Sequence, residues 1–140
     1  MSDCIFCKII SGDIQSVKVY EDAEFTAFLD INPVQPGHTL VVPKAHFARF
    51  DDTPSEVIAK LYQVVHKVAP AVAKAVDAEG FNASLNNGLA AGQEVFHTHV
   101  HIIPRYIKDG LVAWPRYMGE NKLEQVGQKI RAALKEVVAK

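Results

Sequence analysis

Three histidines alternate along one short stretch of the chain: His97, His99 and His101. Side chains of a β-strand point alternately to opposite faces, so the three imidazoles are expected on one face. Packing alone does not explain such a row, because neighbouring imidazoles repel one another when they are protonated. The remaining explanations are metal binding and catalysis. Alternate strand residues lie roughly 6.5–7 Å apart, too far for all three to reach one metal with Zn–N bonds of about 2.0–2.1 Å. We therefore expect the histidines to divide their roles.

The chemistry of imidazole favours a catalytic role within this row of histidines. The neutral ring is a good nucleophile near its ordinary pKa of about 6.5. Its attack on phosphorus splits a difficult displacement into two easier steps through a covalent intermediate. The preceding loop, residues 88–93, contains glycine and has little bulk. Its backbone N–H groups and the Gln93 amide are suited to hold a phosphate next to the strand.

The chain has two cysteines, Cys4 and Cys7. Two intervening residues are too few for a disulfide that joins distant segments. In a cytosolic protein such a pair more often binds metal or does redox chemistry.

The composition fits one soluble globular domain. The chain has 140 residues, of which 49% are hydrophobic and 22% charged, and its formal net charge is -1. This balance lacks the basic footprint of a protein that binds nucleic acid polymers. The N-terminal residues do not resemble a signal peptide, and no stretch is long and apolar enough to span a bilayer. We therefore expect a cytoplasmic protein with no nucleic acid polymer and no membrane as partner.

A run of short strands must position the histidines. Their expected ranges are 17–21, 25–30, 38–42, 81–85 and 95–104. In the last of these, Phe96, Val100 and Ile102 are expected to point into the core, away from the histidines.

One long helix interrupts the run of strands. It is expected to begin near Thr53, where a T-x-x-E pattern ending at Glu56 predicts a capping box. Pro70 is expected to kink or interrupt it, and Gly80 to end it. Apolar residues at helical spacing over 123–137 predict a C-terminal amphipathic helix. This order favours an α+β fold over a doubly wound parallel sheet.

The motifs resemble those of the histidine triad (HIT) family. Residues 97–103 match its His-φ-His-φ-His-φ-φ motif, where φ is apolar, except that Thr98 occupies a φ position. Four other segments are typical of the family: residues 4–10, 30–33, 36–44 and 92–93. The resemblance implies a single HIT domain over residues 1–140, with a helical C-terminal extension over about 118–140. The implied α+β fold is a five-stranded antiparallel sheet with one long helix and a C-terminal helix.

The resemblance, to bacterial Hint-like members in particular, implies a hydrolase or transferase that attacks the α-phosphorus of a nucleotide. It implies His99 as the nucleophile that forms a nucleotidyl-histidine intermediate, His101 as its partner at the phosphate, and His38 as their support. The implied nucleotide-binding residues are Phe6, Ile9, Phe28, Asp30, Ile31, Asn86, Gln93, Val95, His99 and His101. Among them, Asn86 and Gln93 match positions that hold phosphate.

Some of these residues have simpler interpretations. Asp30 matches a residue that binds ribose hydroxyls, yet it can also organise a turn. Phe28 and Ile31 match the apolar slot for the base, yet they can be plain core residues. Glu94 stands where Hint-like members often carry a serine. A carboxylate there repels phosphate if it points inward, or it contacts an amine leaving group.

The resemblance also implies a zinc site around the cysteine pair. Many bacterial members bind zinc through two cysteines and two histidines, which match Cys4, Cys7, His46 and His97. A site with four protein ligands is closed, so the zinc is expected to be a structural cofactor, and no organic cofactor is expected. The alternative is two free cysteines and a surface His46. His66, on the long helix, is expected to be a bystander.

Three functions stay open at this point. The first is a purine nucleoside phosphoramidase, which cleaves conjugates such as AMP-amine. The second is a dinucleoside polyphosphate hydrolase, since Arg105 follows the triad strand as a basic residue does in that branch. The third is a nucleotide-binding regulatory module with incidental hydrolysis. The family also implies a small AMP- or GMP-like partner and a homodimer, in which Trp114 and Tyr117 are expected to reach toward the partner's site.

Overall fold

The structure is a computed structural model that describes residues 3–111 and 117–139. It divides into two compact units, Met1–Asp109 and Gly110–Lys140. The first unit contains the sheet, with the elements α1 (Ile5–Ser11), β1 (Lys18–Glu21), β2 (Phe25–Leu29), β3 (Thr39–Pro43), α2 (Ser55–Ala75), β4 (Gly80–Ser84) and β5 (Val100–Arg105). The strands follow the order β1-β2-β3-β5-β4, and each neighbouring pair is antiparallel. The predicted α+β fold with a five-stranded antiparallel sheet is therefore confirmed.

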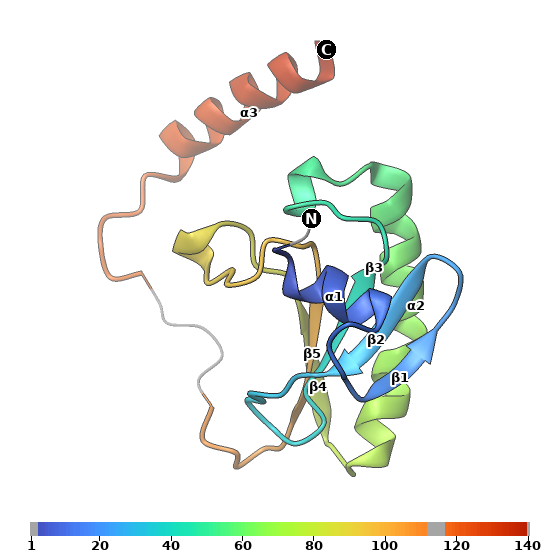
Figure 1. The fold of residues 1–140 in the computed structure, drawn as a ribbon. Coiled ribbons are helices and arrows are strands. Elements are labelled where there is room, and N and C mark those ends of the chain that lie inside the picture. The colour runs from blue at the N-terminus through green and yellow to red at the C-terminus, as the bar shows by residue number, and fades with distance from the viewer. Residues whose placement is uncertain (1–2, 112–116, 140) are drawn as a thin grey trace. The chain divides into compact units, whose positions relative to one another are not determined.

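The two faces of the sheet are covered by different helices (Figure 1). Val41 of β3 joins a buried cluster with Leu61 of α2, while its neighbours Leu40 and Val42 join a second cluster with Phe6 of α1. Alternation along the strand thus sends successive side chains to α2 and to α1. The triad strand β5 contributes Val100 and Ile102 to the cluster on the α2 side.

The short helix α1 was not expected from the sequence. Its N-cap is Cys4, whose Sγ accepts the backbone N–H of Cys7 at 3.3 Å. It ends at Gly12, whose φ of +89° is in the left-handed region that glycine enters without strain. The helix therefore brings the two cysteines onto one turn.

The start of α2 differs from the prediction. Pro54 occupies the N-cap position and makes no side-chain capping bond. Thr53 does not cap the helix. Its hydroxyl donates to the Arg49 carbonyl at 2.7 Å and lies 2.8 Å from the Thr98 hydroxyl. The predicted capping box is therefore wrong, because a contact to a distant segment takes the hydroxyl.

The end of α2 also differs. The helix runs through Pro70 to Ala75, so the proline does not interrupt it. Gly80 does not end the helix but begins β4.

The first four strands lie within one residue of their predicted bounds, but the triad strand is shorter than predicted. β5 begins at Val100, and residues 95–99 form no strand. Phe96 is 40% exposed rather than part of the core, whereas Val100 and Ile102 are completely buried. Residues 95–99 bond to another segment instead: the backbone N–H of Thr98 donates to the Phe47 carbonyl at 2.7 Å.

The second unit contains the predicted C-terminal helix, α3 (Leu123–Ala139). Leu123, Val126, Ile130 and Leu134 are exposed apolar side chains of this helix, and Tyr117 before it is 80% exposed. Trp114 lies outside the described residues. No helix in the described ranges is long and apolar enough to cross a membrane.

Candidate functional site

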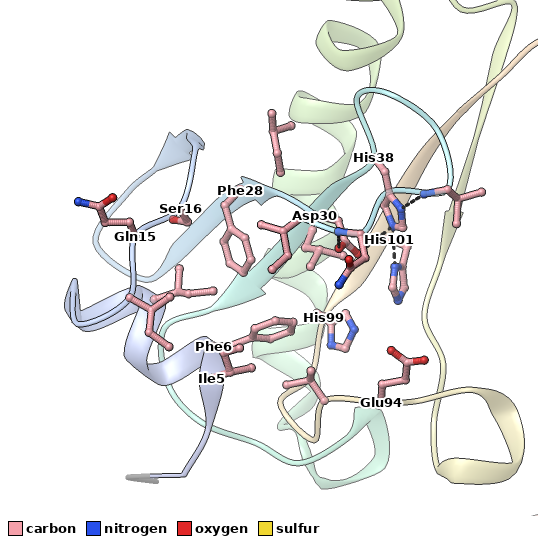
Figure 2. A pocket seen from close by; sticks show the side chains of 18 of the residues that line it. Ile5, Phe6, Gln15, Ser16, Phe28, Asp30, His38, Glu94, His99 and His101 are labelled. Carbon is pink, nitrogen blue, oxygen red and sulfur yellow. Dashed lines mark hydrogen bonds and ion pairs between the residues drawn. The ribbon is translucent and has the colours of Figure 1, made fainter.

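A cavity of about 380 Å³ lies where the chain enters β5. Apolar side chains of α1 and the sheet form one part of its wall, and the polar part carries Asp30, His38, Glu94, His99 and His101 (Figure 2). A hollow with an apolar part and converging polar groups is the usual form of a small-molecule site. The structure therefore brings most of the predicted site residues to one place.

The apolar part matches the slot predicted for a base. Phe6 packs edge-on against Phe28 with ring centroids 5.4 Å apart, and edge-on against His99 at 4.9 Å. Phe28 is a core residue and also lines the cavity. Ile31 is 82% exposed at the cavity wall, so it is not a core residue. Two further predicted residues, Ile9 and Val95, also line the cavity.

His99 is held in one tautomer by the backbone. Its Nδ1 lies 2.6 Å from the carbonyl oxygen of His97. A carbonyl only accepts, so Nδ1–H donates, and Nε2 of the neutral ring carries the lone pair. Burial lowers the pKa of His99 and outweighs the opposing effect of this hydrogen bond, so the ring is neutral near pH 7. A neutral imidazole with an available lone pair is the nucleophilic form.

A chain of hydrogen bonds sets the tautomer of His101. The backbone N–H of Val34 donates to His38 Nδ1 at 3.1 Å, so the proton of neutral His38 is on Nε2. His38 Nε2 lies 2.9 Å from His101 Nδ1 and donates to it. The remaining N–H of His101 is therefore on Nε2, and His101 lines the cavity as a donor. The role of Val34 was not predicted, since no residue type marks a backbone donor.

The carboxylate of Asp30 makes two contacts. Its Oδ1 accepts the backbone N–H of Asn32 at 2.8 Å, which is the turn-forming contact considered from the sequence. Its Oδ2 lies 3.7 Å from His38 Nε2. Burial lowers the pKa of His38, and the negative charge of Asp30 opposes that effect. Asp30 thus organises the turn and also lines the cavity beside the histidines.

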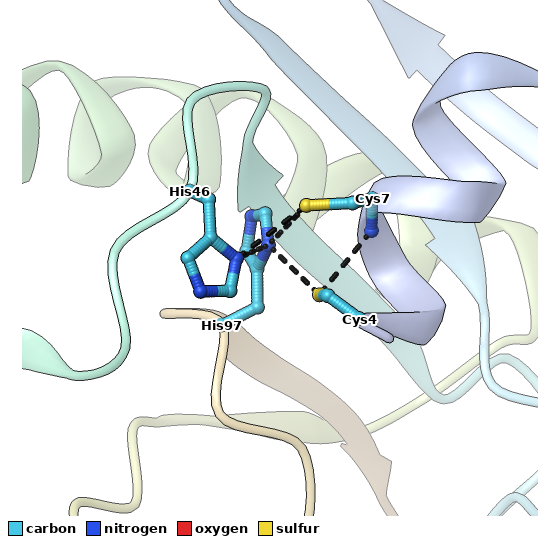
Figure 3. Close-up of side chains that lie close together, drawn as sticks. All are labelled: Cys4, Cys7, His46 and His97. Carbon is cyan, nitrogen blue, oxygen red and sulfur yellow. Dashed lines mark hydrogen bonds between the residues drawn. The ribbon is translucent and has the colours of Figure 1, made fainter. Parts of the chain in front are cut away.

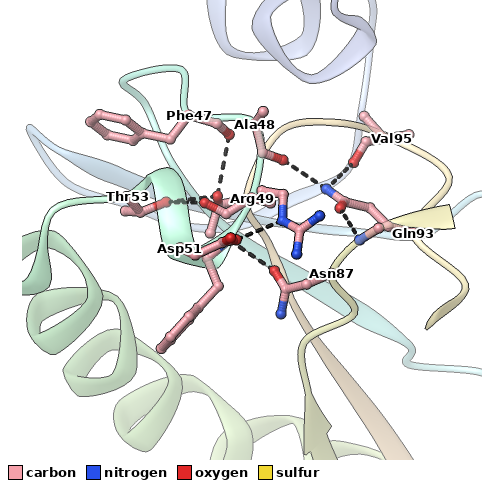
Figure 4. A network of polar contacts seen from close by, with 11 residues as sticks. Phe47, Ala48, Arg49, Asp51, Thr53, Asn87, Gln93 and Val95 are labelled. Atoms are coloured by element: carbon pink, nitrogen blue, oxygen red, sulfur yellow. Dashed lines mark hydrogen bonds and ion pairs between the residues drawn. The ribbon is translucent and has the colours of Figure 1, made fainter. Parts of the chain in front are cut away.

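The loop before the triad is held from within by Gln93, which is 2% exposed (Figure 4). Its Nε2 donates to the carbonyls of Ala48 and Val95 at 2.7 and 3.1 Å, and its Oε1 accepts the N–H of Gly88 at 2.8 Å. These bonds commit both amide hydrogens. Gln93 therefore positions the loop rather than presenting its amide to the cavity.

Asn86 lies close to the same loop. A Cβ at Gly92 would lie 3.6 Å from Asn86 Nδ2, so this amide is next to the loop backbone. Gly92 itself has φ +91° and lines the cavity, where its lack of a side chain lets the backbone approach a ligand.

Replacing Gln93 by alanine is expected to lower the free energy of unfolding by about 2–4 kcal/mol. The substitution leaves partly buried backbone groups at Gly88 and Ala48 without their partner. We also expect a weaker affinity for the predicted AMP-like ligand, because the loop loses the hydrogen bonds that hold it. Urea unfolding and titration calorimetry measure the two effects. The control is Gln63→Ala, at an exposed glutamine of α2 that does not line the cavity. Gln15 does line the cavity and is not used. An unchanged unfolding free energy contradicts the assigned role.

Arg105 does not reach the cavity. Its Nε and one terminal nitrogen donate to the two carboxylate oxygens of Asp109 at 2.7 and 3.1 Å, and the other donates to Asn82 Oδ1 at 2.7 Å. Arg105 is the last residue of β5, whereas the cavity lies at its beginning. His66 is exposed on α2, away from the site, as expected for a bystander.

A second cluster contains the cysteine pair (Figure 3). Cys4 Sγ lies 3.4 Å from His97 Nδ1, Cys7 Sγ lies 3.4 Å from His46 Nδ1, and the two imidazole Nδ1 atoms are 3.2 Å apart. All four ligand atoms lie within 4.8 Å of one another. Cys4 and Cys7 form no disulfide, and His46 is partly buried beside them rather than fully exposed at the surface.

The donor chemistry of the cluster fits a metal ion. A tetrahedral zinc site with bonds of about 2.0–2.3 Å places its ligand atoms roughly 3.3–3.8 Å apart. His97 Nε2 lies 2.7 Å from the Pro43 carbonyl and donates to it, so Nδ1 presents a lone pair to the cluster. A carbonyl on the outer nitrogen is the usual support of a metal-binding histidine. The Pro43 carbonyl was missed from the sequence, because a backbone acceptor leaves no residue signal.

The chain belongs to the HIT family. Residues 11–108 match the HIT domain family. An adenosine 5'-monophosphoramidase hnt1 of Schizosaccharomyces pombe is 42% identical over 135 residues, which cover 94% of this chain and 98% of that protein. An adenylylsulfatase HINT3 of Arabidopsis thaliana is 46% identical over 112 residues, which cover 80% of this chain but only 57% of that protein.

A solved structure of a related protein also bears on the cysteine cluster. The zinc-bound histidine triad family protein of Mycobacterium smegmatis has 40% sequence identity and a TM-score of 0.76, covering 99% of this chain and 97% of that one. The cluster of Cys4, Cys7, His46 and His97 is compatible with a zinc ion in this chain as well.

Proposed function

We propose that the protein is a nucleotidyl hydrolase that cleaves the P–N bond of purine nucleoside phosphoramidates such as AMP-amine. The observation that carries the proposal is the tautomer of His99, whose Nε2 lone pair is on a ring that lines the cavity. The names of the Schizosaccharomyces pombe and Arabidopsis thaliana relatives support hydrolysis at an adenylyl phosphorus. In this proposal the base occupies the apolar slot, and Asp30 faces the ribose.

The reaction proceeds in two displacements. His99 Nε2 attacks the α-phosphorus, and the P–N bond breaks with its electron pair going to nitrogen, which takes up a proton from solvent. His101 Nε2–H donates to a phosphate oxygen and stabilises its developing charge. Water then attacks the nucleotidyl-histidine, releasing the nucleoside monophosphate and a proton and restoring neutral His99.

We infer that the cysteine cluster holds a structural zinc ion. Cys4, Cys7, His46 and His97 would occupy all four positions of a tetrahedral ion, which leaves none for substrate. His97 is two residues from His99, so the ion would fix the start of the catalytic segment to α1. No step of the proposed reaction passes through the ion.

The contacts of Arg105 weaken the case for a dinucleoside polyphosphate hydrolase. Its guanidinium is paired with Asp109 and Asn82, at the end of β5 away from the cavity. The basic residue that suggested this branch is therefore not placed to bind a polyphosphate.

A substrate panel tests the proposed function. The protein is incubated with adenosine phosphoramidate, adenylyl sulfate and diadenosine tetraphosphate, and AMP release is measured. We expect the phosphoramidate to be cleaved with the highest kcat/KM. Preferential cleavage of the tetraphosphate refutes the proposal, and micromolar binding of AMP without any turnover favours a regulatory module.

The acid limb of the pH profile is expected to lie unusually low. Burial, followed by the nearby His99 and His38, lowers the pKa of His101 to about 4. A lowered pKa keeps His101 neutral in mild acid, so it continues to accept from His38 and to donate from Nε2. The pKa of the nucleophile His99 is lowered by burial as well, so we expect kcat/KM for adenosine phosphoramidate to fall in acid with a midpoint below the ordinary 6.5 of histidine.

Short assays separate this titration from unfolding. Protein kept at pH 7 is diluted into each buffer, assayed, and returned to pH 7. Full recovery of activity excludes irreversible unfolding, and a circular dichroism spectrum recorded in each buffer shows that the fold is retained during the assay. A reversible midpoint near the ordinary histidine value contradicts the assignment.

We also propose a homodimer in the cytoplasm, as the family resemblance implies. The edge strand β4 has an exposed Phe81, and no further strand among the described residues pairs with its outer edge, where a second copy could join. Sedimentation equilibrium of the purified protein distinguishes a dimer from a monomer.

A further inference from the structure

Glu94 adds a charged group to the cavity that the proposed reaction does not use. It follows Gln93 directly, its side chain is exposed, and it lines the cavity together with Gly92 and His99. Within residues 3–111 and 117–139, no hydrogen bond or ion pair holds its carboxylate. The carboxylate is therefore available to a ligand.

The position of Glu94 relates it to one part of a substrate. In Figure 2, Phe28 and Glu94 lie on opposite sides of His99, with His101 on the same side as Glu94. If the base occupies the slot at Phe28 and its phosphorus lies at His99, the leaving group extends toward Glu94. This step rests on the proposed function.

The cavity contains no cation to balance that carboxylate. Among the described residues that line it, none is a lysine or arginine, and Asp30 adds a second carboxylate. His38 and His101 are neutral in the hydrogen-bonded chain, because each accepts a hydrogen bond at Nδ1. A sulfate or polyphosphate leaving group would thus place its negative charge beside Glu94 with no compensating group.

We propose that Glu94 determines leaving-group specificity, selecting amines that carry a second, protonated amino group. The substrate class is a nucleoside monophosphate joined through a P–N bond to one end of a diamine. The ammonium at the other end pairs with the Glu94 carboxylate. Glu94 takes no part in breaking the P–N bond. When the P–N bond breaks, nitrogen keeps the electron pair and takes up a proton from solvent, as in the parent reaction.

Three adenosine phosphoramidates of equal chain length test the proposal. Their leaving groups are 1,4-diaminobutane, butylamine and 4-aminobutanoate, which present a positive, a neutral and a negative end on the same P–N bond. We expect kcat/KM of the wild-type protein to decrease in that order, with the diamine favoured over the acid by about tenfold or more. Added salt should shrink this ratio, because exposed charges are screened.

The ratio of diamine to acid is then measured in Glu94→Gln and Glu94→Ser. Both variants remove the charge, and we expect the ratio to fall close to one in each. Glu56→Gln, at an exposed glutamate on α2 away from the cavity, should retain the wild-type ratio. Because each ratio is taken within one variant, a change in its overall rate does not affect the comparison.

Two results overturn the assignment of Glu94: equal rates for the three substrates in the wild-type protein, or an unchanged ratio in both Glu94 variants. In either case cleavage of the butylamine conjugate leaves the proposed function standing. If the wild-type protein cleaves none of the three, the proposed function fails together with this inference.

Discussion

Replacing His99 by alanine is expected to lower the turnover of adenosine phosphoramidate by about a thousandfold or more. The substitution removes the Nε2 lone pair that attacks phosphorus, and His101 cannot replace it. Its Nδ1 lone pair is occupied by the hydrogen bond from His38, and its Nε2 carries a proton. Single-turnover kinetics with the variant in excess over substrate measures the loss directly. Quenching in alkaline denaturant, in which a nucleotidyl-histidine P–N bond is stable, followed by mass spectrometry should detect an adenylyl group on the wild-type protein and none on the variant.

The control for this experiment is another histidine. His66 is exposed on α2, and His66→Ala should retain wild-type turnover. AMP affinity and the circular dichroism spectrum of His99→Ala should stay close to those of the wild type, which shows that the site remains assembled. Retained turnover in a folded His99→Ala protein refutes its role as the nucleophile.

Removal of zinc is expected to lower the melting temperature by about 10 °C or more. The ion would join α1 to the segments that carry His46 and His97, and structural zinc contributes many kcal/mol to folding. In a domain of this size each kcal/mol corresponds to roughly 3–6 °C. The protein purified without added zinc should contain about one equivalent, and a strong chelator should produce the shift in a thermal melt.

Matched substitutions show whether the shift comes from this cluster. His46→Ala and Cys7→Ser should lose the metal and melt at low temperature with or without chelator. His66→Ala should bind zinc and melt like the wild-type protein. A wild-type protein that contains no zinc, or one that melts unchanged after chelation, contradicts the assignment.

Part of the site is apparent from local sequence. The spacing of His97, His99 and His101 indicates that their roles differ, and the interval between Cys4 and Cys7 is typical of metal ligands. Alternation and helical periodicity placed four strands within one residue of their bounds and predicted α3. These signals are readable because strand and helix each impose a repeat on the buried side chains.

Contacts between distant segments changed the interpretation of other residues. Thr53 has the pattern of a helix cap, yet its hydroxyl meets Thr98, which lies 45 positions away. Gln93 has the position of a phosphate ligand, yet its amide is taken up by backbone groups that include the Ala48 carbonyl. A polar side chain bonds to whatever partner the packed core leaves beside it, and its neighbours in sequence do not reveal that partner.

The sequence by itself determined the fold class, the histidine row and the cysteine pair, because these depend on residue type and short spacing. The family resemblance already assigned His97 and His99 different roles, and only the tertiary structure decided which contacts separate them. The attachment of Thr98 to Phe47 keeps residues 95–99 out of the strand, His97 joins the cysteine cluster, and His99 lines the cavity. The tertiary structure also decided the tautomers of His99 and His101, because the carbonyl and N–H groups that set them come from the folded backbone.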